Sequence, residues 1–214
     1  STGANNTAVG HAALDANTTA SYCTAVGQQA LTANTTGTQN TAVGQAALAA
    51  NTTGQQNIAL GYNALVANTT SNNNTALGFA ALFTQTADGT ENTAIGRYSL
   101  YHNTTGYNNI GVGNQTLEAN TTGHDNTAVG RNALVANTTG NYNIAIGRGA
   151  LDDNTTGSQN VAVGMHALGG NTTAAYNTAV GHDALKANTT GANNVAVGKN
   201  ALDANTTANN NIAI

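Results

Sequence analysis

The side chains able to perform acid–base, metal or nucleophilic chemistry are few in this 214-residue chain. There are five histidines, one cysteine, nine acidic and five basic residues, so only 7% of the chain is charged. The histidines do not converge, and Asp152-Asp153 lies far along the chain from Asp183. A metal site needs three or four converging ligands, and glycoside hydrolysis needs two facing carboxyl groups. We therefore expect no catalytic residue, no metal site and no cofactor.

Composition also restricts the partners. A net charge of −4 leaves little to neutralise phosphates, so we expect no nucleic acid. No apolar run approaches ~18 residues, so we expect no membrane insertion. The chain starts at Ser1 without a recognisable signal peptide or anchor and ends within a repeat. We expect a processed chain or a segment of something longer.

Internal repeats are the elements that position every side chain. Glycines recur from Gly10 to Gly198 at steps of 17 residues, with one step of 18 between Gly78 and Gly96. The consensus is N-T-A-V-G-x-x-A-L-x-A-N-T-T-G-x-x, numbered here as positions one to seventeen. Residues that share a position form a row. A fixed period of this length predicts a solenoid. We expect one domain over residues 1–214, with an irregular coil near 79–96 and no other domain.

Two segments of each repeat have the pattern of short strands. Position two holds only Thr, Ile or Val, and position four is always aliphatic. This alternation predicts a strand whose positions two and four point inward and whose position-three alanine points outward. A second strand is expected in the A-L-x-A segment, which carries Leu at position nine from Leu14 to Leu202. Gly at position five and Asn at position twelve suit the corners.

The predicted fold class is all-β, a parallel β-solenoid of about twelve coils with two short strands per coil. Coils stacked at ~4.8 Å would form a rod of roughly 60 Å. The charges support this cross-section. All fourteen charged side chains fall at positions six, seven, ten, eleven or seventeen, or in the irregular coil, and none falls on the rows expected inside.

The position-three alanines predict a neighbour. The free energy that one coil gains by burial and hydrogen bonding nearly equals the entropic cost of ordering its 17 residues. We therefore expect the rod to bury further apolar surface against another chain. An outward row kept small and apolar suits contact with another chain, and we expect a homo-oligomer, a trimer or a polymer. The candidate inter-chain row contains Ala8, Ala25, Ala42, Ala59, Ala76 and Ala94.

Aromatic residues gather around the irregular coil, where residues 85–89 replace the N-T-T-G turn. Exposed aromatic clusters often mark contact surfaces. Contact with sugar or a partner chain is one interpretation, and local packing under a distorted loop is the other. The candidate surface contains Tyr62, Phe79, Phe83, Tyr98 and Tyr101.

Eleven N-T-T sequons allow two interpretations. They are formal N-glycosylation acceptors, and their asparagines could instead stack into an amide ladder. Cys23 replaces Asn at position one, either as a small residue accepted in such a ladder or as a cysteine that pairs between chains. The candidate asparagines are Asn17, Asn34, Asn51, Asn68, Asn103, Asn120, Asn137, Asn154, Asn171, Asn188 and Asn205.

The first half of each repeat carries a family resemblance. N-T-A-V-G at 40–44, N-I-A-I-G at 143–147 and N-V-A-V-G at 160–164 resemble the head repeats of YadA-like trimeric autotransporter adhesins. The longer pattern, from N-T-A-x-G through A-L to N-T-T-G, is similar to repeats in phage and bacterial fibre proteins. The resemblance implies a left-handed β-roll, a trimer, and a place on a cell surface or in a virion fibre.

Together these observations predict a structural, non-enzymatic, extracellular fibre segment that associates with itself through small-residue rows. It would belong to a bacterial surface filament or adhesin, or to a phage fibre shaft, and could contact surface carbohydrate or a host receptor. An ice-binding β-solenoid and a carbohydrate-binding solenoid module are the alternatives. Ice binding is the less favoured, because the adjacent threonines of N-T-T occupy a turn.

Overall fold

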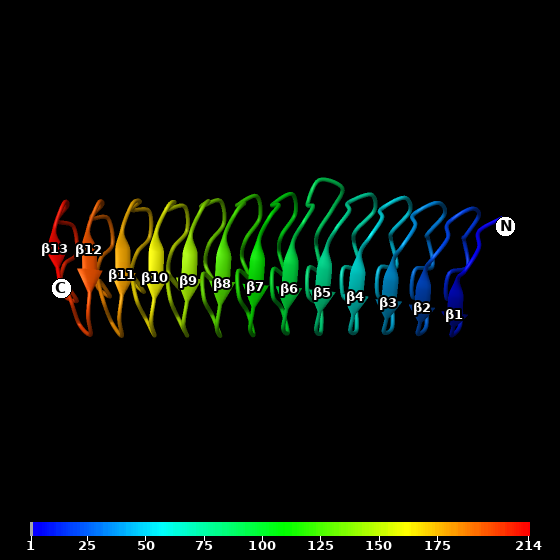
Figure 1. Cartoon of the computed structure of the whole chain (residues 1–214), viewed down its shortest axis with the longest axis horizontal. Helices are drawn as coiled ribbons and strands as arrows, with labels where there is room; N and C mark the ends of the chain where they lie inside the picture. The colour runs from blue at the N-terminus through cyan, green and yellow to red at the C-terminus, as the bar shows by residue number, and fades with distance from the viewer. Residues whose placement is uncertain (1) are drawn as a thin grey trace.

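A computed structural model describes residues 2–214 as a rod of stacked coils, ordered from the N-terminus to the C-terminus (Figure 1). Thirteen strands form one parallel sheet in chain order, which confirms the predicted parallel β-solenoid. The strands are β1 Thr7–Val9, β2 Thr24–Val26, β3 Thr41–Val43, β4 Ile58–Leu60, β5 Thr75–Leu77, β6 Thr93–Ile95, β7 Ile110–Val112, β8 Thr127–Val129, β9 Ile144–Ile146, β10 Val161–Val163, β11 Thr178–Val180, β12 Val195–Val197 and β13 Ile212–Ala213. Residues 2–214 include no helix that is long and apolar enough to cross a bilayer.

Equivalent residues of successive coils pair directly. Between β3 and β4, for example, Ala42 faces Ala59 and Val43 faces Leu60. The backbone ladder continues outside the strands, where Ala46 N–H donates to Gln28 O at 2.9 Å. Because the register never slips, each side chain has its own row above and below it, which explains why the rows are so uniform.

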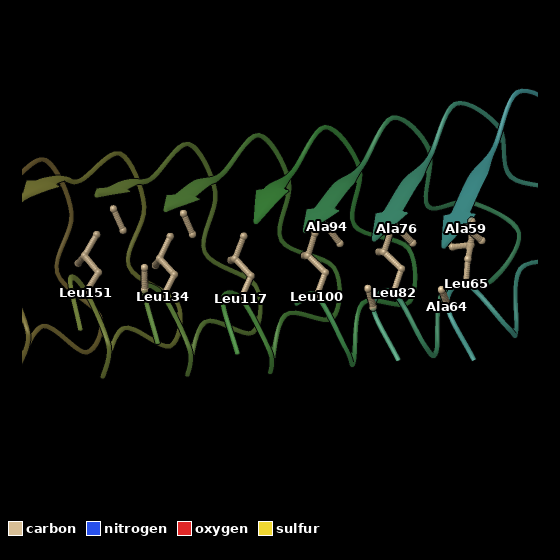
Figure 2. Close-up of a cluster of buried hydrophobic side chains, with 14 of the residues drawn as sticks. Ala59, Ala64, Leu65, Ala76, Leu82, Ala94, Leu100, Leu117, Leu134 and Leu151 are labelled. Atoms are coloured by element: carbon tan, nitrogen blue, oxygen red, sulfur yellow. The ribbon is translucent and has the colours of Figure 1, made fainter. Parts of the chain in front are cut away.

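The orientation of the strands is the reverse of the predicted one. The position-three alanines, such as Ala42 and Ala59, are fully buried. Positions two and four point outward, and Ile58 and Leu60 are 47% and 41% exposed. The prediction that the β-branched rows pack inside was therefore wrong. The interior holds one large side chain per coil, the position-nine leucine, against the alanines of positions three and eight (Figure 2).

A substitution inside the core shows why alanine points inward. Gly111, in β7, stands at position three of its repeat. An added Cβ there would lie 2.5 Å from Ser99 Oγ and 3.0 Å from Thr116 Oγ1. Ser99 and Thr116 replace the usual alanine at position eight. The two rows thus face each other across a narrow interior, and a missing methyl on one wall accompanies larger side chains on the other. Two rows of Val or Ile would overfill this space.

The A-L-x-A segment is not a strand. Positions seven and nine have left-handed backbone, with φ of 56° at Ala46 and 52° at Leu48. The segment is nevertheless bonded to its neighbours, since Leu48 N–H donates to Ala64 O at 3.0 Å. The predicted second strand was therefore wrong, although the leucine row does point inward as expected.

The glycine corner behaves as predicted. Gly44 has φ of 132°, and an added Cβ would lie 2.5 Å from the carbonyl oxygen of Gly61 in the next coil. Both the backbone conformation and the stacking distance exclude a side chain at this position.

The 18-residue coil follows β5 and forms the taller loop seen in Figure 1. Gln85 replaces the position-twelve asparagine and is fully buried. Its Nε2 donates to Gly89 O at 2.5 Å, and its Oε1 accepts from Asn92 Nδ2 at 3.1 Å and from Asn103 Nδ2 at 3.3 Å. The longer side chain reaches the following coil, but Asn68 Oδ1 in the preceding coil has no hydrogen-bond partner among residues 2–214, so the amide row is interrupted at this turn.

Candidate functional site

The sequon asparagines form the amide ladder. Asn51 Nδ2 donates to Asn34 Oδ1 at 2.8 Å and to Gly54 O at 3.0 Å, and the same two bonds recur along the row. The nine candidate asparagines from Asn34 to Asn188 are fully buried, while Asn17 and Asn205 at the two ends of the rod are partly exposed. An oligosaccharide cannot be attached to a buried amide that already donates two hydrogen bonds. For the nine buried asparagines, the glycan interpretation was wrong in the folded rod.

A second amide ladder runs through position one, and sequence analysis recognised it only through Cys23. Asn57 N–H donates to Asn40 Oδ1 at 3.0 Å, and Asn57 Nδ2 donates to Ser71 O at 2.8 Å. Each side chain thus donates to the position-fifteen carbonyl of its own coil and accepts from the position-one N–H of the next coil. The near-invariance of Asn at position one was the available signal.

Cys23 fits this second ladder as a small residue. Its side chain is 1% exposed, and its Sγ lies 3.3 Å from Gly37 O. Burial raises the pKa of the Cys23 thiol, against the lowering effect of backbone hydrogen bonds. A buried, protonated thiol is unreactive, so this position does not support the disulfide between chains that the sequence left open.

The five candidate aromatic residues form one connected network. Tyr62 stacks on Phe79 with centroids 5.2 Å apart, and Phe83 stacks on Tyr101 at 4.9 Å. Tyr98 links the two pairs edge-on, at 5.5 Å from Phe79 and 5.2 Å from Tyr101. Tyr62 and Phe79 remain almost half exposed. The rings therefore pack against one another from coil to coil and also offer apolar surface to solvent.

The candidate inter-chain alanines do not form an outer surface. Ala25, Ala42, Ala59, Ala76 and Ala94 are fully buried inside the rod. Ala8, in the first coil, is exposed there. Contact between chains through this row was therefore a wrong expectation, because the row already packs against the leucines and alanines of its own chain. The exposed rows are those of positions two and four, called the outer sheet face below.

A hollow of about 440 Å³ lies near the C-terminal end of the rod. Gly169 and Gly170 replace the side chains of positions ten and eleven, and this opens the space between Asp152 and Lys186. Asp183 also lines it, so the structure places on one hollow the carboxylates that the sequence kept apart. Lys186 Nζ lies 3.2 Å from Asp183 Oδ1, and His182 Nδ1 lies 3.0 Å from Asp183 Oδ2.

The electrostatics of this hollow centre on Asp152. Partial burial raises the pKa of its carboxyl group, and the adjacent Asp153 charge raises it further. His166 and Lys186 act in the opposite direction. Within residues 2–214, no three His, Cys, Asp or Glu side chains converge as metal ligands.

The comparisons with known proteins give no relative. No family model matches the chain, and neither the curated proteins nor the solved structures contain a match.

Proposed function

We propose that this solenoid is a structural, non-enzymatic segment of an extracellular fibre, in a bacterial surface filament or adhesin or in a phage fibre shaft, and that it associates with copies of itself. The observation that carries the proposal is the outer sheet face, defined by positions two and four of β1 to β13. It presents β-branched and aliphatic side chains in two unbroken rows along the rod.

The size of this face supports a neighbour. Twelve strands of three residues and one of two cover roughly 60 Å by 10 Å, or about 600 Å². Seven of its position-two residues are Thr, so the apolar part is smaller than this and lies within the about 300–600 Å² of apolar patches that monomers tolerate. The whole face approaches the ~800 Å² per partner of a standard interface. Aliphatic side chains in a parallel sheet favour a covered face, since both faces of such sheets are usually buried.

Flanking tyrosines extend the apolar surface. Tyr22, Tyr142 and Tyr176 stand at position seventeen, two residues before a strand, and are more than half exposed. Tyrosine suits the edge of an interface because its ring packs while its hydroxyl remains hydrated. A trimer with the outer sheet faces at its centre is the assembly that we propose, in place of one based on the alanine row.

The test is the mass of the particle in solution. Analytical ultracentrifugation of the wild-type chain should give about three times the 21.3 kDa chain mass. The double substitution Ile144→Glu and Ile146→Glu places charges on the outer sheet face and should yield monomers. The control is Thr139→Glu with Thr156→Glu, two exposed turn residues, which should preserve the trimer. A wild-type chain that is monomeric at micromolar concentration would rule out self-association.

Ice binding is a second candidate, favoured by the orientation of the strands. Seven strands carry Thr at position two on the flat outer face, from Thr7 in β1 to Thr178 in β11. The turn threonines are thus not the only regular Thr row. The two functions need the same face, because a trimer would cover the surface that ice must reach. A monomeric rod with thermal hysteresis would favour ice binding, whereas a trimer without hysteresis would favour the fibre.

A further inference from the structure

Position six forms a row whose chemistry differs from that of the rest of the rod. The chain has five Lys and Arg residues in total, and four of them (Arg97, Arg131, Arg148 and Lys199) stand in this row. No acidic residue occupies it, although the chain carries a net charge of −4. Cations are therefore concentrated along one line of an acidic rod.

The row is held straight by the backbone ladder. Gln115 N–H donates to Arg97 O at 3.0 Å, and Gly149 N–H donates to Arg131 O at 3.1 Å. His166 N–H continues the series with Arg148 O at 3.0 Å. Position-six side chains therefore follow one another at the ~4.8 Å spacing of the coils. Position six also follows the glycine corner, so the row lies outside the outer sheet face.

The arginines of this row are not neutralised by the protein. Residues 2–214 contain three ion pairs, and none of them involves an arginine. Arg131 and Arg148 are exposed and stand at the same position in consecutive coils. Like charges stacked directly above one another in adjacent coils repel each other, as they do in neighbouring strands. An anion that bridges the two guanidinium groups would remove this repulsion.

Aromatic rings continue the same row toward the N-terminus. Tyr62 and Phe79 occupy position six in the two coils before Arg97, and they are 44% and 45% exposed. Arg97 lies over the Tyr98 ring, with its Cζ 4.4 Å from the centroid. One stripe therefore combines apolar ring surface with guanidinium groups that no carboxylate of residues 2–214 pairs. In order, it contains Tyr62, Phe79, Arg97, Asn114, Arg131 and Arg148.

We propose that this stripe binds an acidic polysaccharide lying parallel to the rod axis. The arginines would pair with its carboxylate or sulfate groups, since a guanidinium binds planar anions with two donors. The exposed rings would pack against the CH groups of its sugar rings, and Asn114 would hydrogen-bond hydroxyl groups. A linear polymer suits the stripe because the donors recur at a constant spacing along one line. The binding does not depend on the self-association proposed above.

The test measures binding to polysaccharides of different charge. Alginate and chondroitin sulfate serve as acidic probes, and dextran serves as the neutral one, in calorimetry at low and at high salt. The wild-type rod should bind both acidic probes more weakly in salt and should not bind dextran. Arg131→Gln with Arg148→Gln should weaken binding at least tenfold. Lys186→Gln removes a cation outside the row and should change affinity less than twofold. No binding by the wild type, or an equal loss with Lys186→Gln, would overturn the proposal.

A second pair of variants tests for sugar rather than for anions in general. Tyr62→Thr with Phe79→Thr should weaken alginate binding several-fold and leave inorganic polyphosphate binding unchanged. If polyphosphate or single-stranded DNA bound as tightly as alginate, and the aromatic substitutions had no effect, the stripe would be a general anion surface and the proposal would be wrong. Ultracentrifugation of the same variants reports self-association separately.

Discussion

The amide corner and the outer sheet face distribute polarity in opposite ways. Asn120 and Asn137 are fully buried, whereas Ile58 and Leu60 are almost half exposed. The amides can be buried because each coil supplies partners for the next along most of the row, although Asn17 Oδ1 and Asn68 Oδ1 have no hydrogen-bond partner in the part of the chain that the structure describes. The aliphatic rows are outside because the interior accommodates one leucine and two alanines per coil. Stacking geometry, and not hydrophobicity alone, therefore decides which row is inside.

The largest effect is expected from breaking the amide corner. Asn120→Leu keeps the branching and heavy-atom count of the side chain and removes hydrogen bonds to Asn103 Oδ1 at 2.7 Å, to Gly123 O at 2.9 Å and from Asn137 Nδ2 at 2.9 Å. Asn103 Oδ1 and one N–H of Asn137 Nδ2 would be left without a partner, at about 1–3 kcal/mol each, while Gly123 O keeps its bond from Asn109 Nδ2. Because the bulkier leucine adds the cost of overpacking, the total loss should reach at least about 3 kcal/mol. Urea denaturation followed by circular dichroism measures it. Thr122→Ala, on the exposed side of the same turn, should change stability by less than about 0.5 kcal/mol.

A pair of substitutions in β8 tests which face of the strand is inside. Ala128→Val adds two methyl groups to the filled interior and should cost about 1–3 kcal/mol. Val129→Ala removes the same groups from the outer sheet face and should cost less than about 1 kcal/mol in a monomer. Both substitutions are made in the Ile144→Glu, Ile146→Glu variant, so that the chain is monomeric. Thermal unfolding then measures the stability of each. A larger loss for Val129→Ala would reinstate the inward orientation of position four.

The sequence was sufficient for the repeat, the parallel stack and the leucine row, because each depends on the period alone. It was not sufficient for the orientation of the strand, since alternation separates two faces without saying which one is inside. One repeat has Gly111 in place of alanine at position three and Thr116 in place of alanine at position eight, and the preceding repeat has Ser99 at position eight. This paired change was the available clue that positions three and eight face each other. The left-handed backbone at position nine has little signal, because leucine does not favour positive φ, whereas Asn63, Asn132 and Asn200 at position seven were an available signal for it.

The facing of Gly111 with Ser99 and Thr116 supplies a third test. Gly111→Ala restores the consensus on one wall only, and its Cβ would overlap Ser99 Oγ and Thr116 Oγ1. The hydrogen bond from Ser99 Oγ to Gly111 O, at 3.0 Å, would also be strained. We expect a loss of about 1–3 kcal/mol. Adding Ser99→Ala and Thr116→Ala should bring stability back to within about 1 kcal/mol of the wild type. Additive losses in a mutant cycle would contradict the facing of positions three and eight.

The smallest effect is expected at Asp152, where a carboxylate is half-buried in the hollow instead of being bonded like the corner amides. Burial and the Asp153 charge raise the pKa of Asp152 in the folded state, so folding favours the protonated form. Its contribution to stability therefore increases as the pH falls through the folded pKa toward the ordinary value of 3.8. Asp152→Asn should raise the melting temperature by about 1 °C at pH 7, and the gain should vanish near pH 4. Asp15→Asn, at the same position in an exposed setting, is the control that removes an equal charge outside the hollow. An equal gain for the two variants at pH 7 would mean that general charge reduction, and not the hollow, is responsible.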